Sequence, residues 1–244
     1  MIELPWLDPE QPPLFPSVDE ALSDPPGLLA FGGQLNAHWL LHAYQSGIFP
    51  WFNPGEPILW WSPSPRMVIL PAEFKVRRSL KKTLRKQLYD ITFDQDFKSV
   101  LEGCAASRNY TEESWLTPEM RHAYLALHHA GHAHSVEAWQ DGKLVGGLYG
   151  VAIGRIFCGE SMFAKATDAS KVAFVHLVEQ LKAWKFELID CQVYTDHLAS
   201  FGAKEIERQA FLGYLAEYAN VAMPLELTPP EPWCLEQRIK ESVL

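Results

Sequence analysis

The stretch SVEAWQDGKLVGGLYGVAIGRIFCGESMF, residues 135–163, decides the fold of this chain. It consists of three apolar segments separated by two short polar connections, Asp141-Gly142 and Gly154-Arg155. A two-residue connection of the Asp-Gly type between apolar segments is a strong signal for a β-hairpin. The stretch therefore predicts three consecutive antiparallel strands.

Helices and strands alternate after this stretch. Residues 168–184 have an apolar stripe at helical spacing, Phe174, Leu177, Val178 and Leu181, and residues 188–194 read as an apolar strand. A short helix at 197–202, a strand at 204–207 and a helix at 211–219 complete the pattern, whereas a strand and two helices at 90–107 and 117–131 precede it. The order strand, strand, strand, helix, strand, helix, strand is typical of an N-acyltransferase-like α/β (α+β) domain. We assign residues 66–244 to this domain, with a Pro-rich tail from Pro224 that we expect to lie across the surface.

Residues 1–65 are rich in Pro and Trp and are predicted to form a small N-terminal domain. A short helix is expected from Asn36 to Ser46, followed by five prolines between Pro50 and Pro65 that argue against a helix or a central strand. This rigid loop carries four aromatic side chains. They either pack in the core or form a stacking platform for a flat ligand such as a base: Trp51, Phe52, Trp60 and Trp61.

The composition is that of an ordinary globular protein. Hydrophobic residues make up 48% and charged residues 21% of 244 residues, enough for one large domain and a small appended one. No apolar run approaches the roughly 18 residues of a membrane span, and the acidic, Pro-rich start is unlike a signal peptide. The four Cys form no CxxC pair, so we expect free thiols and a cytoplasmic location.

Positive charge is concentrated in one segment of this acidic chain. Residues 75–86, KVRRSLKKTLRK, hold seven of the 21 Lys and Arg and no acid. The whole chain has a net charge of −9, so the remaining residues together have a net charge of −16. At about 100° per residue, Leu80, Leu84 and Leu88 share one helical face. The opposite face is either a solvated surface or a phosphate-binding one, and it carries Arg78, Lys81, Lys82, Arg85 and Lys86.

Three polar residues near the ends of two predicted strands could carry chemistry. Asp190 and Gln192 lie two residues apart in a strand, so their side chains are expected on one face, where two polar groups suggest either a cleft or a pair that braces a loop. Glu160 shares a face with Met162 by the same alternation, and is either a functional carboxylate or a hairpin residue.

Neither a metal nor another cofactor is predicted. Positions 128 and 132 have the spacing of helical metal ligands, but no neighbouring acid or Cys completes a site with His128, His129, His132 and His134. The phosphate loops of dinucleotide-binding and P-loop proteins and the nucleophile elbow of α/β-hydrolases do not occur in the sequence. A Gln/Arg-x-x-Gly-x-Gly loop does not precede residue 168, which argues against an acyl-CoA donor.

Several longer motifs, in one order over about residues 15–215, resemble the bacterial leucyl/phenylalanyl-tRNA-protein transferases: GIFPWFNPGEPILWWSPSPR, SWLTPEM, GHAHSVEAW, LVGGLYG, FCGESMF, DASK and LIDCQV with HLASFGA. The resemblance implies an acetyltransferase-like (GNAT-like) catalytic domain. It also implies transfer of leucine or phenylalanine, and methionine less well, from aminoacyl-tRNA to proteins with N-terminal Arg or Lys, marking them for N-end-rule degradation. We expect a monomer that needs no cofactor and no membrane.

The resemblance also implies a role for particular residues. Asp190 and Gln192 match the family's catalytic pair, and Glu160 its acidic residue beside the aminoacyl pocket. Trp51 and Trp115 match the aromatics that hold the terminal adenosine. The aminoacyl pocket is expected to include Leu148, Met162 and Leu177, and the tRNA acceptor stem to contact Arg78, Lys81, Lys82, Arg85 and Lys86.

An aminoacyl ester is already activated, so positioning of the attacking amine should dominate catalysis. We expect Asp190 to orient and polarise Gln192, whose amide oxygen accepts a hydrogen bond from the amine. In the competing account Asp190 holds the acceptor's N-terminus while a ribose hydroxyl carries the proton. Two other functions stay open from the residues alone: an N-acyltransferase that uses acyl-CoA, and a non-catalytic tRNA-binding module.

Overall fold

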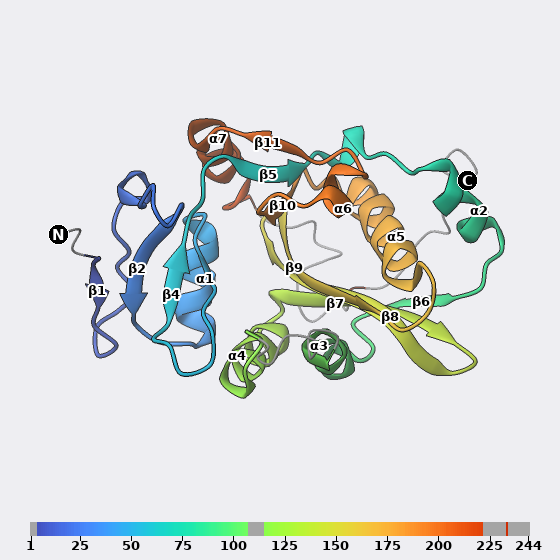
Figure 1. Cartoon of the computed structure of the whole chain (residues 1–244), viewed down its shortest axis with the longest axis horizontal. Coiled ribbons are helices and arrows are strands. Elements are labelled where there is room, and N and C mark those ends of the chain that lie inside the picture. The colour runs from blue at the N-terminus through green and yellow to red at the C-terminus, as the bar shows by residue number, and fades with distance from the viewer. Residues whose placement is uncertain (1–3, 107–114, 222–232, 234–244) are drawn as a thin grey trace.

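The computed structural model of the chain describes residues 4–106, 115–221 and 233. Two β-sheets, one of four and one of seven strands, dominate it (Figure 1). The seven-stranded sheet has the order β11-β5-β10-β9-β8-β7-β6. Its strands are β5 (Arg66–Ile69), β6 (Asp90–Phe93), β7 (Ala133–Gln140), β8 (Lys143–Ile153), β9 (Ile156–Ala164), β10 (Leu188–Gln192) and β11 (Lys204–Ile206).

The three predicted antiparallel strands are confirmed as β7, β8 and β9. Asp141 and Gly142 have φ values of 50° and 71°, the left-handed conformations that a tight hairpin turn requires. At the next turn, Gly154 (φ 55°) lies so close to the Tyr218 carbonyl that a side chain would collide with it. β10 pairs with β9 in parallel, whereas every other pairing in this sheet is antiparallel.

Helices cover both faces of the large sheet (Figure 1). α5 (Ala169–Ala183) and α2 (Arg78–Arg85) pack on one face, where Leu80, Leu84 and Leu177 join the core. The opposite face packs against α3 (Phe97–Ala106) and α4 (Pro118–His129). Two short elements, η2 (Pro71–Glu73) and α6 (Asp196–Ala199), and the helix α7 (Arg208–Tyr218) lie near β5, β10 and β11.

The small sheet has the order β1-β2-β4-β3 and packs with helix α1. The predicted helix at residues 36–46 is confirmed as α1 (Ala37–Gln45), which the Asn36 side chain caps by accepting from the Trp39 N–H. The prediction that the proline-rich segment holds no central strand is wrong, because Leu59–Trp61 contains no proline and forms β4 between two neighbours. The other elements are β1 (Trp6–Leu7), η1 (Val18–Glu20), β2 (Leu28–Gly32) and β3 (Phe49–Pro50).

The basic helix is shorter than predicted. It begins at Arg78 and ends at Arg85, and Gln87 follows with a positive φ of 48° that breaks the helical path. Leu88 is therefore 45% exposed and does not share the buried face of Leu80 and Leu84.

The C-terminal tail, predicted to cross the surface from Pro224, lies outside the described residues except for Trp233. That indole is buried and stacks on His134 at a centroid distance of 3.7 Å. None of the helices in the described part of the chain combines the length and hydropathy that a membrane span needs.

Candidate active site

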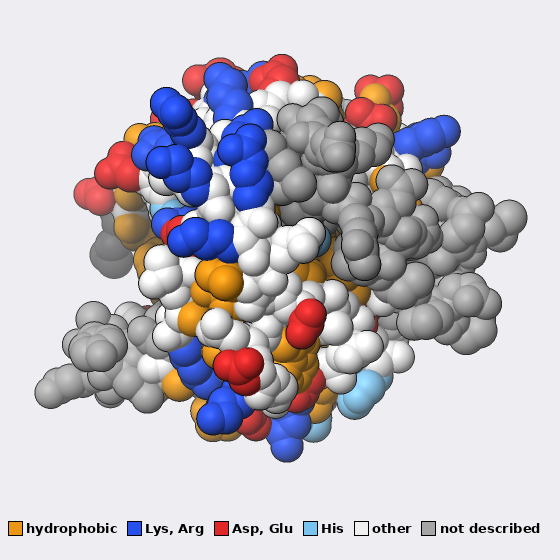
Figure 2. All heavy atoms as spheres, turned by 90° about the vertical axis from the view of Figure 1, so that its right-hand side faces the viewer, with side chains coloured by type: hydrophobic (Ala, Val, Ile, Leu, Met, Phe, Trp, Pro, Cys, Tyr) orange, Lys and Arg blue, Asp and Glu red, His pale blue; other side chains and the backbone are white. Residues whose placement is uncertain are grey.

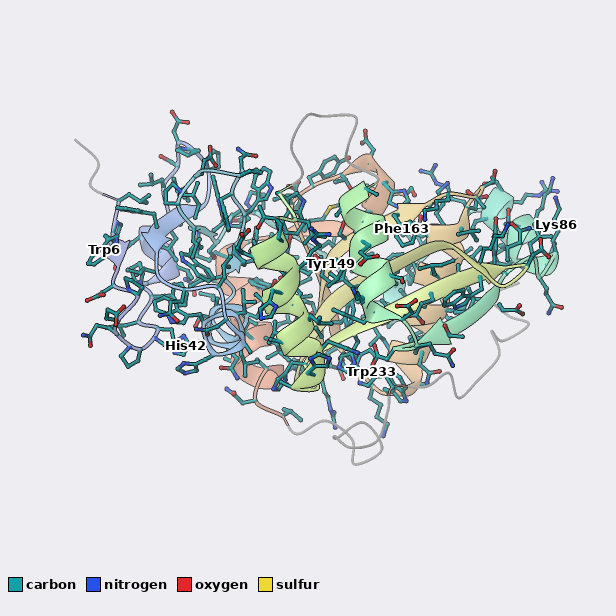
Figure 3. All side chains as sticks on the ribbon, turned by 90° about the horizontal axis from the view of Figure 1, so that it is seen from below. Trp6, His42, Lys86, Tyr149, Phe163 and Trp233 are labelled. Atoms are coloured by element: carbon teal, nitrogen blue, oxygen red, sulfur yellow. The ribbon has the colours of Figure 1, made fainter. Side chains whose placement is uncertain are left out.

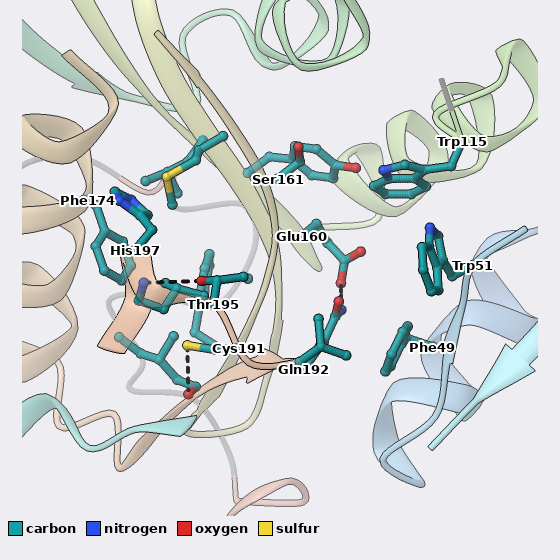
Figure 4. A pocket seen from close by; sticks show the side chains of 18 of the residues that line it. Phe49, Trp51, Trp115, Glu160, Ser161, Phe174, Cys191, Gln192, Thr195 and His197 are labelled. Atoms are coloured by element: carbon teal, nitrogen blue, oxygen red, sulfur yellow. Dashed lines mark hydrogen bonds between the residues drawn. The ribbon is translucent and has the colours of Figure 1, made fainter. Parts of the chain in front are cut away.

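The parallel strands β9 and β10 pair only at their first three positions, from Leu188 opposite Ile156 to Asp190 opposite Cys158. Beyond this point β9 continues along β8, whereas β10 ends at Gln192. A cavity of about 340 Å³ opens where the two strands separate (Figure 4). The sheet thus provides a hollow whose walls are two strand ends.

The cavity is mostly apolar and has two distinct ends. Phe174 and His197 lie at one end, and Trp51 and Trp115 face each other at the other (Figure 4). Trp51 is 49% exposed, whereas Trp115 is buried. Apolar side chains from β3, β8, β9, β10 and α6 complete the walls: Phe49, Leu148, Phe157, Met162, Ile189, Cys191 and Leu198.

The end of β10 departs from regular strand geometry. Its pairing with β5 shifts register between Asp190 and Gln192, and Gln192 has a φ of 64°, in the left-handed region that is unfavourable for a residue with a side chain. Consequently Cys191 and Gln192 both line the cavity, whereas Asp190 does not. The prediction that Asp190 and Gln192 present one common surface by strand alternation is therefore wrong.

Asp190 is bound to a buried arginine. Arg66 Nε and Nη2 donate to its two carboxylate oxygens at 2.8 and 2.7 Å, and both residues are 1% exposed. The guanidinium lies between the rings of Phe49 and Phe211, at 4.8 and 4.7 Å from their centroids. Asp190 Oδ1 also accepts from the main-chain N–H of Gln192 at 2.9 Å. Asp190 thus holds the turn that places Gln192, and its contact is with the backbone of Gln192.

The Gln192 side-chain amide is held by Glu160 instead. Gln192 Nε2 donates a hydrogen bond to Glu160 Oε1 at 2.7 Å (Figure 4). The other end of this amide, the Gln192 oxygen, is not bound to Glu160. Glu160 Oε2 accepts from the Tyr124 hydroxyl at 2.7 Å, and the Tyr44 hydroxyl lies 2.6 Å from that of Tyr124. A chain of hydrogen bonds therefore runs from α1 through α4 to β9 and β10.

The surroundings make Glu160 an unusual carboxyl group. Burial raises its pKa to about 7; the hydrogen bonds from Tyr124, Tyr44 and Gln192 oppose that rise, and the nearby Asp190 charge adds to it. Burial also raises the pKa of both tyrosines well above the usual value, with Glu160 acting in the same direction. Near neutral pH, Glu160 can therefore gain or lose a proton, whereas Tyr44 and Tyr124 remain hydroxyl groups.

Two other kinds of chemistry have little support in this cavity. Burial, followed by the Asp190 charge, raises the pKa of the Cys191 thiol, so this pocket residue is not a nucleophilic thiolate near pH 7. The described ranges contain no cluster of three or more His, Cys, Asp or Glu side chains that could hold a metal ion. His128 stacks on Phe97, and His134 contacts Asp94 and Trp233.

Six of the residues singled out in the sequence line this one cavity: Trp51, Trp115, Leu148, Glu160, Met162 and Gln192. Leu177 does not line it, because that face of α5 packs onto the sheet and buries the side chain completely. Phe174, about one turn earlier on α5, takes part in the wall instead. Sequence reasoning missed Tyr44, Tyr124 and Arg66. An arginine in the otherwise apolar segment 66–70 was the one available signal.

The cationic side chains of α2 lie apart from the cavity. Arg78, Lys82, Arg85 and Lys86 are exposed and Lys81 is half-buried, and none of the five takes part in an ion pair within the described residues. Lys and Arg side chains gather on this end of the molecule (Figure 2). Lys86 and Trp6 mark opposite ends of the chain's long axis, with the pocket residue Tyr149 between them (Figure 3).

Comparisons with known proteins cover nearly the whole chain. Residues 68–216 match the family model described as leucyl/phenylalanyl-tRNA protein transferase, and residues 33–64 match the model of that enzyme's N-terminal domain. A leucyl/phenylalanyl-tRNA–protein transferase of Nitrosospira multiformis is 54% identical over 96% of this chain and 97% of its own. A transferase of the same name from Chromobacterium violaceum is 54% identical over 98% and 100%, respectively.

Solved structures show weaker similarity. A conserved protein of unknown function from Bacteroides thetaiotaomicron aligns with a TM-score of 0.40 and 14% identity, over 64% of this chain and 56% of that one.

Proposed function

Since the chain belongs to the leucyl/phenylalanyl-tRNA protein transferase family, we propose that it transfers leucine or phenylalanine from aminoacyl-tRNA to the N-terminal amine of proteins that begin with Arg or Lys. The chain is thus an aminoacyltransferase. Methionine is also accepted in this proposal, although less well, because an apolar pocket distinguishes apolar side chains of similar size by only about 1–3 kcal/mol. The modified proteins enter N-end-rule degradation.

The observation that carries the proposal is the order of groups along the cavity. Mostly apolar walls, with His197 among them, form one end, the Glu160–Gln192 pair lies between, and two tryptophans lie at the other end (Figure 4). An aminoacyl ester has the same order of parts: an apolar side chain, a reactive carbonyl and an adenosine. Trp51 and Trp115 would hold the adenine at about 1–3 kcal/mol per stacked base.

The reaction needs alignment more than activation. With Gln192 Nε2 bound to Glu160, the Gln192 amide oxygen can accept a hydrogen bond from the attacking amine. The amine nitrogen bonds to the ester carbonyl carbon, the bond from that carbon to the ribose oxygen breaks, and one amine proton ends on the ribose oxygen. Asp190 contributes by fixing the Gln192 backbone, which differs from our expectation that it polarises the side-chain amide.

Binding of tRNA is assigned to the cationic face of α2, through phosphate contacts of Arg78, Lys81, Lys82, Arg85 and Lys86. Lys86, beside this face, marks one end of the long axis and the pocket residue Tyr149 lies nearer the middle, so a ligand that reaches both must be extended, as an acceptor stem is (Figure 3). We further propose an acetyltransferase-like fold for residues 66–244, a small N-terminal domain at 1–65, and a monomer. The antiparallel strands β6 to β9, followed by α5 and the parallel strand β10, support the fold assignment.

Purified protein mixed with radiolabelled Leu-tRNA and a peptide that starts with Arg should place label on the peptide. A peptide with an acetylated N-terminus is the control, because it has no free amine and should stay unlabelled. Label on neither peptide, together with measurable binding of coenzyme A, would favour an acyl-CoA enzyme instead. Binding of tRNA without transfer would favour a non-catalytic tRNA-binding module.

A further inference from the structure

The hydrogen-bond chain behind the cavity suggests how the proton of the attacking amine is handled. An amide oxygen accepts a hydrogen bond but does not hold a proton near neutral pH, so Gln192 can orient the amine and cannot act as its base. Among the pocket-lining residues that the structure describes, Glu160 is the sole carboxylate. It is bonded directly to the Gln192 amide at 2.7 Å, so both groups face the same part of the cavity.

Building on the proposed function, we propose that Glu160 is the proton acceptor for the attacking amine and that Tyr44 and Tyr124 are positioning residues that keep its carboxylate ionised and aimed at the cavity. As the neutral amine attacks the ester carbonyl, the nitrogen–carbon bond forms and Glu160 takes a proton from that nitrogen. Glu160 then gives this proton to the ribose oxygen as the ester carbon–oxygen bond breaks. The carboxylate is regenerated, so the step needs no other reactant.

The two tyrosines suit this task because of their direction and burial. The Tyr124 hydroxyl donates a hydrogen bond to Glu160 Oε2. The Tyr124 oxygen can therefore accept a hydrogen bond from the Tyr44 hydroxyl, 2.6 Å away in a buried contact. Donors to a carboxylate stabilise its charged form. Tyr44 belongs to α1 and Tyr124 to α4, so the helix that packs with the small sheet contributes to the surroundings of the reacting group.

The charges around Glu160 set the sign of the expected effects. Asp190 on β10 raises its pKa, Gln192, Tyr124 and Tyr44 lower it through hydrogen bonds, and Arg66 on β5 and Cys158 on β9 also interact with its charge. Removing a tyrosine hydroxyl removes a bond to the charged form only. The pKa of Glu160 should therefore rise in Tyr124→Phe, and rise less in Tyr44→Phe, because the hydrogen bond from Tyr124 lowers this pKa more than that from Tyr44.

The test is the pH profile of transfer from Leu-tRNA to an Arg peptide, measured for wild type, Tyr124→Phe, Tyr44→Phe and Glu160→Gln. The acid limb should move to higher pH by about one unit in Tyr124→Phe and by less in Tyr44→Phe. The titration of the peptide amine is the same for every variant, so it cannot produce this shift. Glu160→Gln should lower kcat by about 10²–10⁴-fold. Tyr214→Phe on α7, away from the chain of bonds, is the matched control and should leave the limb in place.

A second readout does not depend on turnover. In protein carrying ¹³C-labelled glutamate, the carboxyl signal that disappears in Glu160→Gln should titrate near pH 7 and move upward in Tyr124→Phe. Transfer by the wild type with an unmoved acid limb and an unmoved carboxyl signal in Tyr124→Phe would overturn this inference alone. Absence of transfer by the wild type from both Leu-tRNA and Phe-tRNA would overturn the proposed function on which it rests.

Discussion

Two regions of this molecule differ in whether their charged side chains have partners. Where β9 and β10 separate, each carboxylate has defined partners: a buried arginine for Asp190, and a tyrosine hydroxyl and an amide for Glu160. On α2 and at Lys86, which follows it, the five cationic side chains make no ion pair within the described residues. Charged groups with partners stabilise the structure or shift a pKa, whereas surface charges without an ion-pair partner are available to a ligand. Substitutions in the first region should therefore alter stability and rate, and those in the second should alter salt-dependent binding.

The largest effect is expected from Arg66→Leu, which leaves the Asp190 carboxylate buried without its partner. Breaking a buried ion pair by removing one partner costs about 3–5 kcal/mol, because the remaining charge stays desolvated. The free energy of unfolding in urea should fall by that amount. The double variant Arg66→Leu, Asp190→Leu should recover much of the loss. Equal losses in the single and double variants would show that the charge of Asp190 does not cause the effect.

The variants Gln192→Ala and Asp190→Asn should distinguish alignment of the attacking amine by Gln192 from stabilisation of the local fold by Asp190. Removing the Gln192 amide should lower kcat by about 10²–10³-fold, because loss of one preorganised hydrogen-bonding group in an active site commonly lowers kcat by that factor. The free energy of unfolding should change little. Asp190→Asn keeps an acceptor for the Gln192 N–H but weakens the bond to Arg66, so it should reduce stability more than Gln192→Ala. Steady-state kinetics and urea unfolding of both variants provide the measurement. Near wild-type turnover of Gln192→Ala would contradict its role.

The pH dependence of stability tests Glu160 independently of any substrate. Its pKa is about 7 in the folded chain and near 4.5 when unfolded, so the folded state binds more protons between these values. The contribution of this group is fully present below pH 4.5 and is lost as pH rises through 7, by about 3 kcal/mol in total. Glu160→Gln does not titrate, so its stability relative to wild type should increase by that amount between pH 4.5 and pH 8. A constant difference across this range would contradict the raised pKa.

The smallest change in the free energy of unfolding is expected from substitutions on α2. The double reversal Lys81→Glu, Arg85→Glu should leave the free energy of unfolding within about 0.5 kcal/mol, as for most surface substitutions. It should weaken tRNA binding and reduce the slope of log Kd against log salt by about 2, one for each lost phosphate contact. Transfer from a leucyl ester of adenosine, which has no acceptor stem, is the control and should not change. An unchanged salt slope would exclude this face as a tRNA contact.

The fold could be predicted where the information is local. The hairpins of β7, β8 and β9 follow from turn residues beside apolar segments, and α1 follows from its Asn36 cap. The prediction failed at β4 because prolines were counted over a whole segment, although the three residues Leu59–Trp61 lie between them. It failed at Leu88 because nothing in the helical periodicity marks the end of α2 at Arg85.

The candidate site was predictable only in part. Strand alternation was applied to Asp190 and Gln192, but a bulge and a left-handed residue cannot be recognised from a glutamine in an apolar strand. The bonds between Arg66 and Asp190, and between Tyr44 and Tyr124, join residues 124 and 80 positions apart, and no local pattern encodes such pairs. The catalytic, adenosine-binding and tRNA-binding roles of the sequence-derived residues stay predictions.

The conformation of Gln192 has a consequence for how this position evolves. At a φ of 64°, glycine would fit the backbone with less steric cost than any residue that has a Cβ atom. Selection for foldability alone would favour glycine there, and glycine would remove the amide from the cavity. Retention of glutamine by natural variants would therefore measure selection on turnover, and drift to glycine would mark lineages that have abandoned the reaction.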